Sequence, residues 1–294
     1  KAPGFTAVAV LSLALGIGAT TTVFCWIQGV LLNPLPGVAR QNEMVVLTTS
    51  HAEQMWDTVS LPDLKDYREQ TETFAGIIGS QVTPACLTVD ERSIWMYGQI
   101  ATANFFDVLG VRPILGRTFL PDEDQKLGGS PVLVLSETFW RRHFGADAGI
   151  VGRKLELNRH PFTVVGVVPS AFHGTMSGLV CDFWAPLSMH REVANFGSLE
   201  NRDDHWLHTQ ARLQPGVTVA RAQSVVDTVG SRLEQAYPKT NRSIRLHVLT
   251  FLQAPYGAQP IFTRVFAILL AVSFGVLLIC AANLANLLLA RATS

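Results

Sequence analysis

Residues of the types that bind metals are few in this sequence, and their spacing is unfavourable. His205 and His208 come directly after Asp203 and Asp204, which suggests a metal site. Strands and loops, however, rarely direct residues i and i+3 at one ion, and no cysteine lies nearby. The acidic run 122–124 resembles the start of a calcium loop, but the glycine and glutamate that complete such a loop are missing from the required positions. The sequence therefore predicts no metal site and no bound cofactor.

Motifs for a nucleophile or a nucleotide are also missing. Ser136 and Ser177 lack the strained strand-to-helix turn that presents a hydrolase nucleophile. The chain has no G-x-x-x-x-G-K-[ST] loop to hold phosphates. We therefore predict that the chain is not an enzyme. Cys86 and Cys181 could form a disulfide in an oxidising compartment, and the sequence leaves that pairing open.

Composition excludes several classes of protein. The 23 Lys and Arg residues balance the 23 Asp and Glu residues, which argues against a nucleic-acid partner. Hydrophobic residues make up 48% of the chain and charged residues 16%, against about 25% charged in typical soluble domains. This excludes a disordered chain and indicates that part of the sequence lies outside water. With 294 residues the chain has room for two ordinary domains.

The charge deficit is concentrated in two apolar runs near the ends. Residues 5–32 and 265–290 contain no Asp, Glu, Lys, Arg or His. A helix rises about 1.5 Å per residue, so each run can cross a hydrocarbon core of about 30 Å. We therefore predict transmembrane helices over both runs. A cleaved signal peptide is the alternative for the first run, but this run is about twice as long as the apolar part of a signal peptide. Lys1 before the first run and Arg291 after the second predict cytoplasmic termini and an extracytoplasmic segment 33–263.

Small and polar residues inside these runs predict contacts between helices. Gly16, Gly18 and Ala19 would let another backbone approach closely. Asn283 and Asn286 share one helix face, where polar groups usually point into a bundle and form hydrogen bonds. A transport path is the alternative interpretation of the two asparagines.

The segment between the runs predicts an α+β extracytoplasmic domain that covers residues 40–250. Residues 40–101 and 205–250 each have a β-α-β pattern, and the two split units can pair into one lobe whose sheet is backed by two helices. Residues 102–204 predict a mixed α/β lobe inserted between them. The expected strands are 44–48, 77–89, 94–101, 132–135, 155–157, 162–168, 207–213 and 244–249.

Capping residues set the expected helix boundaries. Ser60 and Ser136 are placed to cap helices, and residues 218–238 have a helical apolar period that ends at a proline. Residues 155–168 predict a β-hairpin. Its turn, 158–161, lacks the glycine that tight turns prefer, so we expect a looser loop.

An ordered set of segments resembles the MacB-like and FtsX-like ABC transporter permeases, especially a branch of duplicated permeases known from acidobacteria. The most specific segments are 104–113 (NFFDVLGVRP) and 212–217 (RLQPGV). The others are 3–11, 15–19, 31–36, 116–119, 136–140, 144–145, 164–169 and 283–291. No single motif is decisive, but together they cover essentially the whole chain in order. The resemblance implies that residues 40–250 are a MacB-like periplasmic core domain and that 265–290 begin an FtsX-like permease domain, in a fragment of a longer protein.

The resemblance also implies function and partners. It implies a non-catalytic permease subunit in the bacterial cytoplasmic (inner) membrane, with residues 33–263 in the periplasm. ATP would be hydrolysed by a separate cytoplasmic ABC ATPase. A second permease copy, the lipid bilayer, and an adaptor or outer-membrane component are the other implied partners, whereas the substrate is not indicated. A two-span sensor with an extracytoplasmic ligand-binding domain has the same topology and stays open as the alternative.

Overall fold

The computed structural model describes residues 3–27, 33–51, 54–56, 58–70, 72–89, 92–194, 196–254 and 258–292. The chain divides into two units. One unit, here called the helical unit, joins residues 1–34 to residues 257–294. The other, here called the mixed unit, comprises residues 35–256.

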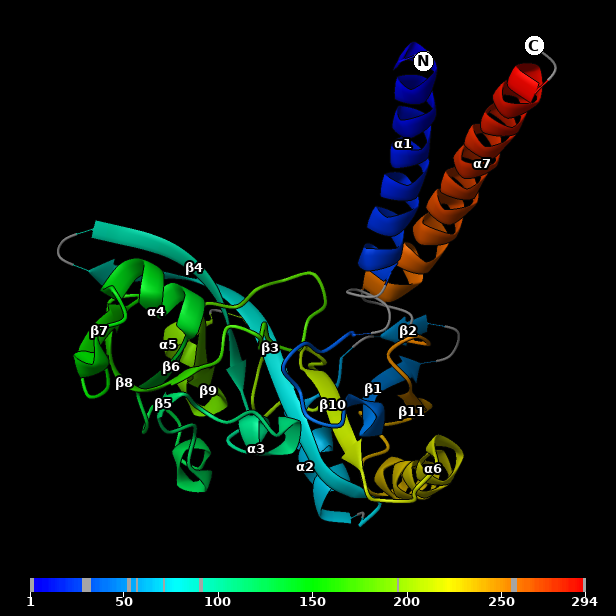
Figure 1. Ribbon diagram of the computed structural model, residues 1–294. Helices are drawn as coiled ribbons and strands as arrows, with labels where there is room; N and C mark the ends of the chain where they lie inside the picture. The colour runs from blue at the N-terminus through cyan, green and yellow to red at the C-terminus, as the bar shows by residue number, and fades with distance from the viewer. Residues whose placement is uncertain are drawn as a thin grey trace. The chain divides into compact units, whose positions relative to one another are not determined.

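The helical unit consists of two helices that lie side by side, α1 (Pro3–Ile27) and α7 (Ala258–Ala292) (Figure 1). Residues 28–32 of the first apolar run lie outside the described part of the chain. The stretch Arg264–Ala282, which overlaps the second run, has a mean hydropathy of 2.8. It is the one stretch among the described residues that is long and apolar enough to cross a membrane, while Gly16–Cys25 in α1 is a shorter apolar stretch.

The mixed unit is built on one sheet of eleven strands in the order β11-β1-β10-β3-β4-β9-β6-β8-β5, with β2 paired to β1 and β7 paired to β3 and β8. The strands are β1 (Met44–His51), β2 (Gln54–Trp56), β3 (Phe74–Val89), β4 (Arg92–Ala101), β5 (Leu115–Gly116), β6 (Val132–Ser136), β7 (Lys154–Leu157), β8 (His160–Val168), β9 (Phe183–Pro186), β10 (His208–Leu213) and β11 (Ile244–Leu249). The helices of this unit are α2 (Leu61–Gln70), α3 (Phe105–Leu109), α4 (Glu137–Phe144), α5 (His190–Val193) and α6 (Val219–Ala236).

Both faces of the central strands are buried. In β1, Val45 and Leu47 belong to one hydrophobic cluster, and Met44 and Val46 belong to a second cluster on the opposite face. Side chains alternate between the two faces of a strand, so a strand that is covered on both sides has a continuous apolar sequence. The first cluster includes the apolar faces of α2 and α6, and the second includes α3.

The long strands β3 and β4 connect the parts of the sheet. They pair antiparallel from Ser80 and Ala101 to Val89 and Arg92. At one end β3 pairs with β10, and β4 pairs in parallel with β9, which belongs to residues 102–204, here called the middle section. One continuous sheet therefore runs from β11 to β5 (Figure 1).

Most of the expected helices and strands are confirmed. The strand predicted over 244–249 is β11, and Thr218 caps α6 by accepting a hydrogen bond from the Arg221 amide. Ser136 caps α4 in the same way through the amide of Phe139. Ser60 accepts a hydrogen bond from the amide of Asp63, as its predicted role at the start of α2 requires.

The prediction of a loose loop in the β7–β8 hairpin was wrong. Leu157 pairs directly with His160, so the turn contains only two residues, Asn158 and Arg159. Both have left-handed backbone angles, with φ of 50° and 68°. Asparagine tolerates this conformation, and its side chain here accepts a hydrogen bond from the Cys86 amide (2.8 Å), so the hairpin is fixed to β3 without a glycine.

Candidate functional site

The segment that leads from α1 into the sheet, residues 35–43, is anchored along its length. We call it the first connector. Leu35 and Val38 are buried in the second hydrophobic cluster. The Ala39 amide donates a hydrogen bond to the carbonyl of Leu109 at the end of α3 (3.2 Å). Gly37 has φ of 78° and lies so close to the backbone of Phe172 that a Cβ atom would come within 2.8 Å of it.

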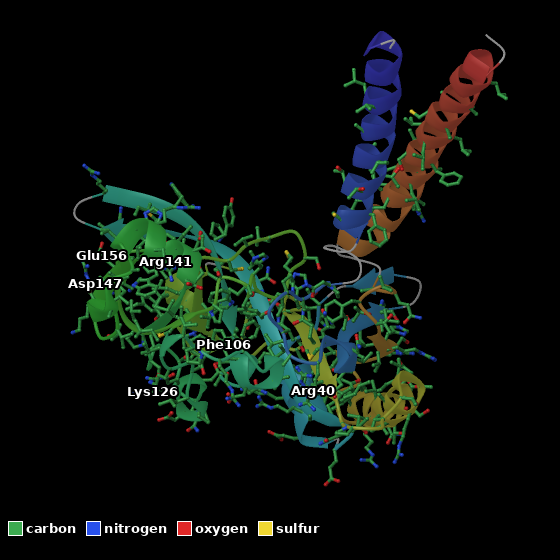
Figure 2. The ribbon with its side chains drawn as sticks, in the orientation of Figure 1. Arg40, Phe106, Lys126, Arg141, Asp147 and Glu156 are labelled. Carbon is green, nitrogen blue, oxygen red and sulfur yellow. The ribbon has the colours of Figure 1, made fainter. Side chains whose placement is uncertain are left out.

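A buried arginine of β10 holds the first connector to the sheet. Arg212 is 6% exposed. Its Nη2 donates to the carbonyl of Ala39 (2.7 Å), and its Nη1 donates to the carbonyl of Arg40 (3.1 Å) and to Oε2 of Glu43 (3.0 Å). Its Nε donates to the carbonyl of Val108 in α3 (2.7 Å). Arg40, which marks this region in Figure 2, thus contributes its backbone to the contact.

The segment that leads from β11 towards α7 is anchored in the same place. Phe251 and Ala254 belong to the second hydrophobic cluster, together with Leu35 and Val38 of the first connector. The turn is closed by Gln253, whose Oε1 accepts hydrogen bonds from the amide and the hydroxyl of Thr250. Both chain segments that join the mixed unit to the helices therefore enter one buried cluster.

That cluster is rich in aromatic side chains. Phe106 of α3 (Figure 2) lies at its centre. Its ring centroid is 5.1 Å from that of Phe119, 5.9 Å from that of Trp184 and 6.1 Å from that of Phe172. Close aromatic packing of this kind resists deformation, because interiors are packed at the density of organic crystals.

A second buried ionic contact lies between α2, the segment before β10 and the loop after α6. Arg202 contacts Asp63, which is 2% exposed, and its Nη1 lies 2.7 Å from Oδ2 of Asp66. Asp63 also accepts a hydrogen bond from Asn241 (2.8 Å), and the Arg202 guanidinium stacks on the ring of Tyr237. The last residues of the middle section are thereby joined to α2 and to the loop after α6, which belong to residues 40–101 and 205–250, here called the first lobe.

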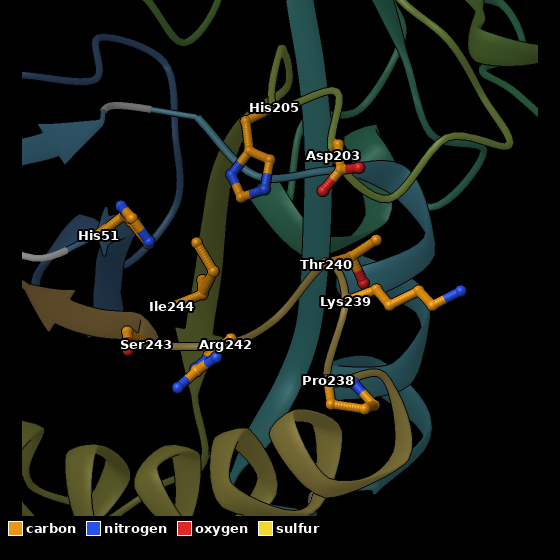
Figure 3. A pocket seen from close by; sticks show the side chains of 9 residues that line it. All are labelled: His51, Asp203, His205, Pro238, Lys239, Thr240, Arg242, Ser243 and Ile244. Carbon is orange, nitrogen blue, oxygen red and sulfur yellow. The ribbon is translucent and has the colours of Figure 1, made fainter.

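A cavity of about 640 Å³ lies beside this contact. It is lined by His51, Asp203, His205, Pro238, Lys239, Thr240, Arg242, Ser243 and Ile244 (Figure 3). Nδ1 of His205 lies 3.2 Å from the hydroxyl of Thr49, and burial lowers the pKa of this histidine. In Figure 3 the Lys239 side chain points away from His205, so the charged groups do not converge on one point.

The structure separates the residues that suggested a metal site. Asp203 and His205 line the cavity, but His208 and Asp204 do not. Among the described residues no group of three His, Cys, Asp or Glu side chains is placed to hold a metal ion. In the acidic run, the carboxylate of Glu123 pairs with Arg117.

Other side chains that could bind a ligand or act as nucleophiles also have structural roles. Asp124 accepts hydrogen bonds from the amides of Ala103 and Ser188. All four cysteines are free, and burial raises the pKa of the Cys181 thiol to about 12, which makes it a poor nucleophile. Ser136 is buried as the cap of α4, so it is not available as a nucleophile.

Of the residues predicted to pack helices, Gly16 faces α7. A Cβ atom on Gly16 would lie 3.2 Å from Cδ1 of Leu277, whereas Gly18 has no atom within 4 Å of that position. Ala19 is partly exposed. The backbones of Asn283 and Asn286 are in α7, but their side chains lie outside the described part of the structure.

Comparison with protein families gives a match over most of the chain. The model of the MacB-like periplasmic core domain matches residues 6–229. The chain belongs to this family. Comparison with curated protein sequences finds no significant match.

Solved structures of the same fold support this assignment. The periplasmic region of MacB from Actinobacillus actinomycetemcomitans has a TM-score of 0.53 and 14% sequence identity, and the alignment covers 78% of this chain and 94% of that one. A domain of a putative permease from Porphyromonas gingivalis has a TM-score of 0.51 at 18% identity, covering 72% and 90%. The extracellular domain of the noncanonic ABC-type transporter YknZ from Gram-positive bacteria has a TM-score of 0.50 at 14% identity, covering 69% and 98%.

Membership in the MacB-like family establishes the kind of domain and the class of protein to which this chain belongs. Its mixed α/β unit is the extracytoplasmic domain of an ABC-transporter-type permease. Such a permease is an inner-membrane component that is not itself catalytic and that works with an ABC ATPase. The narrower resemblance to an acidobacterial branch stays a prediction.

Proposed function

We propose that this chain is part of the permease subunit of a MacB/FtsX/Lol-type ABC transporter and transmits ATP-driven conformational change across the membrane to its extracytoplasmic domain, for efflux or extraction of a substrate. Residues 5–32 and 265–290 are its transmembrane helices, residues 33–263 are periplasmic, and both termini are cytoplasmic. The working assembly contains two permease copies and a cytoplasmic ABC ATPase, and an adaptor or outer-membrane component completes it.

The observation that carries this proposal is the common anchorage of the two connecting segments. One buried cluster holds residues of both segments: Leu35 and Val38 of the first connector, and Phe251 and Ala254 of the segment after β11. A domain that received only a ligand could be joined to its anchors by loose linkers, because flexible linkers transmit little force. Firm attachment at both ends suits transmission of movement.

Exposure of apolar side chains supports the membrane assignment. On α7, Ile268 is 65% exposed, Phe274 57% and Ile279 63%. Exposure of large apolar side chains is unfavourable in water and favourable in the hydrocarbon core of a membrane. The contact between Gly16 and Leu277 supports packing of the two helices. We propose that Gly16, Gly18, Ala19, Asn283 and Asn286 all serve helix contacts within the permease bundle.

The strand order supports a domain division at residues 101 and 205. Strands β1 and β3 lie on either side of β10, and β10 and β11 lie on either side of β1. This is the arrangement of two interleaved β-α-β units, 40–101 and 205–250. The inserted lobe, 102–204, extends the sheet from β4.

Co-purification and topology test the proposal. An affinity-tagged protein should bring down an ABC ATPase whose vanadate-sensitive activity depends on the chain. A membrane-impermeant maleimide should label Lys154→Cys in intact spheroplasts, because Lys154 is exposed in the predicted periplasmic part. Absence of the ATPase together with a co-purifying kinase or cyclase would instead favour the sensor.

A further inference from the structure

We propose that Arg212 is the positioning residue that makes the first connector, the first lobe and the inserted lobe move as one body when force arrives from the membrane. This inference rests on the proposed function. It names the point at which movement of the first helix is passed on to the mixed unit.

The geometry of the Arg212 contact joins three parts of the fold. The side chain belongs to β10 in the first lobe, and its guanidinium contacts the carbonyls of Ala39 and Arg40 in the first connector. The same group contacts the carbonyl of Val108 in α3, within residues 102–204. The Arg212 side chain thus donates hydrogen bonds to both the first connector and α3.

The chemistry of the contact resists opening. Hydrogen bonds from a charged donor are about twice as strong as neutral ones, and Arg212 makes four of them. Glu43 supplies the opposing charge at 3.0 Å. If the first connector moved away, a buried guanidinium would lose two of its three carbonyl acceptors and its counter-ion, which is strongly unfavourable. Displacement of the connector together with both lobes preserves every one of these bonds.

Neighbouring contacts also hold the first connector in place, but they involve no charged group. The Ala39 amide bonds to Leu109, and a Cβ on Gly110 would meet the Ala39 side chain at 2.9 Å. These are neutral contacts between the connector and α3, and they do not reach β10. Removal of the guanidinium fork should therefore loosen the first connector, while the burial of Leu35 and Val38 and the pairing of β1 with β10 still let the chain fold.

Hydrogen exchange of the permease with its ABC ATPase, in lipid nanodiscs, tests the inference. Exchange is measured by mass spectrometry without nucleotide and with ATP and vanadate. Arg212→Lys keeps the charge but loses the planar fork, and Glu43→Gln removes the ion pair but keeps the carbonyl contacts. Arg245→Met is the matched control, because Arg245 is an exposed arginine on β11.

In Arg212→Lys we expect faster exchange of residues 35–43 and loss of the nucleotide-dependent change in residues 102–204, while ATP hydrolysis continues. Glu43→Gln should show a partial loss, and Arg245→Met should behave as the wild type. A purely structural role would lower hydrolysis and movement together. If Arg212→Lys retains the full nucleotide-dependent change, the inference is wrong. If the wild-type complex itself shows no such change, the proposed function fails instead.

Discussion

The guanidinium of Arg202 lies over the ring of Tyr237, with its Cζ 3.8 Å from the ring centroid. Through Nη1 the same guanidinium contacts Asp63 and Asp66 of α2. Tyr237 follows α6, and Arg202 ends the middle section. One cation therefore joins three parts of the sequence that no local interaction would bring together.

Replacement of this cation should be costly. In Arg202→Met the buried carboxylate of Asp63 loses its counter-charge, and we expect the free energy of unfolding to fall by about 3 kcal/mol. Arg141→Met is the control, since Arg141 pairs with Glu137 at an exposed site and the expected loss is below about 1 kcal/mol. Denaturant or thermal unfolding of the solubilised protein measures both. Equal losses in the two variants would show that the Arg202 contact has no special role.

The tight turn of the β7–β8 hairpin predicts opposite effects at adjacent positions. Arg159→Gly should be neutral or should stabilise the protein by up to about 1 kcal/mol, because glycine adopts the left-handed conformation freely. Asn158→Ala should destabilise it by about 1–3 kcal/mol, because the partly buried amide of Cys86 and the carbonyl of Val193 lose their partner. Thermal unfolding distinguishes the two. Destabilisation by Arg159→Gly would contradict the assignment of strain to this turn.

His205 predicts loss of stability in mild acid. Burial lowers its pKa in the folded state below the ordinary value of about 6.5, so the unfolded chain takes up this proton first. The contribution of neutral His205 is fully present above about pH 6.5 and is lost as the pH falls through the folded pKa. Unfolding temperatures measured from about pH 8 down to about pH 5.5 should decline, and His205→Gln should flatten that decline. A slope that is unchanged in the variant would assign it to other groups.

The two glycines of α1 should respond differently to a larger side chain. Gly16→Val places a Cβ 3.2 Å from Leu277 and should weaken the α1–α7 contact by about 1–3 kcal/mol. Gly18→Val places its Cβ more than 4 Å from any described atom of α7 and should leave the α1–α7 contact unchanged. Chemical cross-linking between cysteines placed on α1 and α7, followed on heating, measures the contact. Equal weakening by both variants would contradict a specific packing role for Gly16.

Much of the fold could be predicted from local patterns. The helix caps at Ser60 and Ser136 and the start of the apolar period at Thr218 depend on interactions within a few residues, as does the strand over 244–249. Such features can therefore be predicted from the local sequence. The turn at Asn158 was the local error, because its stability comes from a hydrogen bond to Cys86, 72 positions away.

The sequence by itself determined the two apolar helices, the alternation of strands and helices, and the resemblance to the MacB-like family, which the family comparison confirmed. Each of these depends on residue type and short-range order. The tertiary structure alone decided the roles of Arg202 and Arg212. Arg212 reaches Ala39 across 173 positions, and Arg202 reaches Asp63 across 139. An arginine within the apolar strand 207–213 could have signalled a buried partner, but not which one, because the free energy of a buried charge depends on the acceptors that folding brings to it.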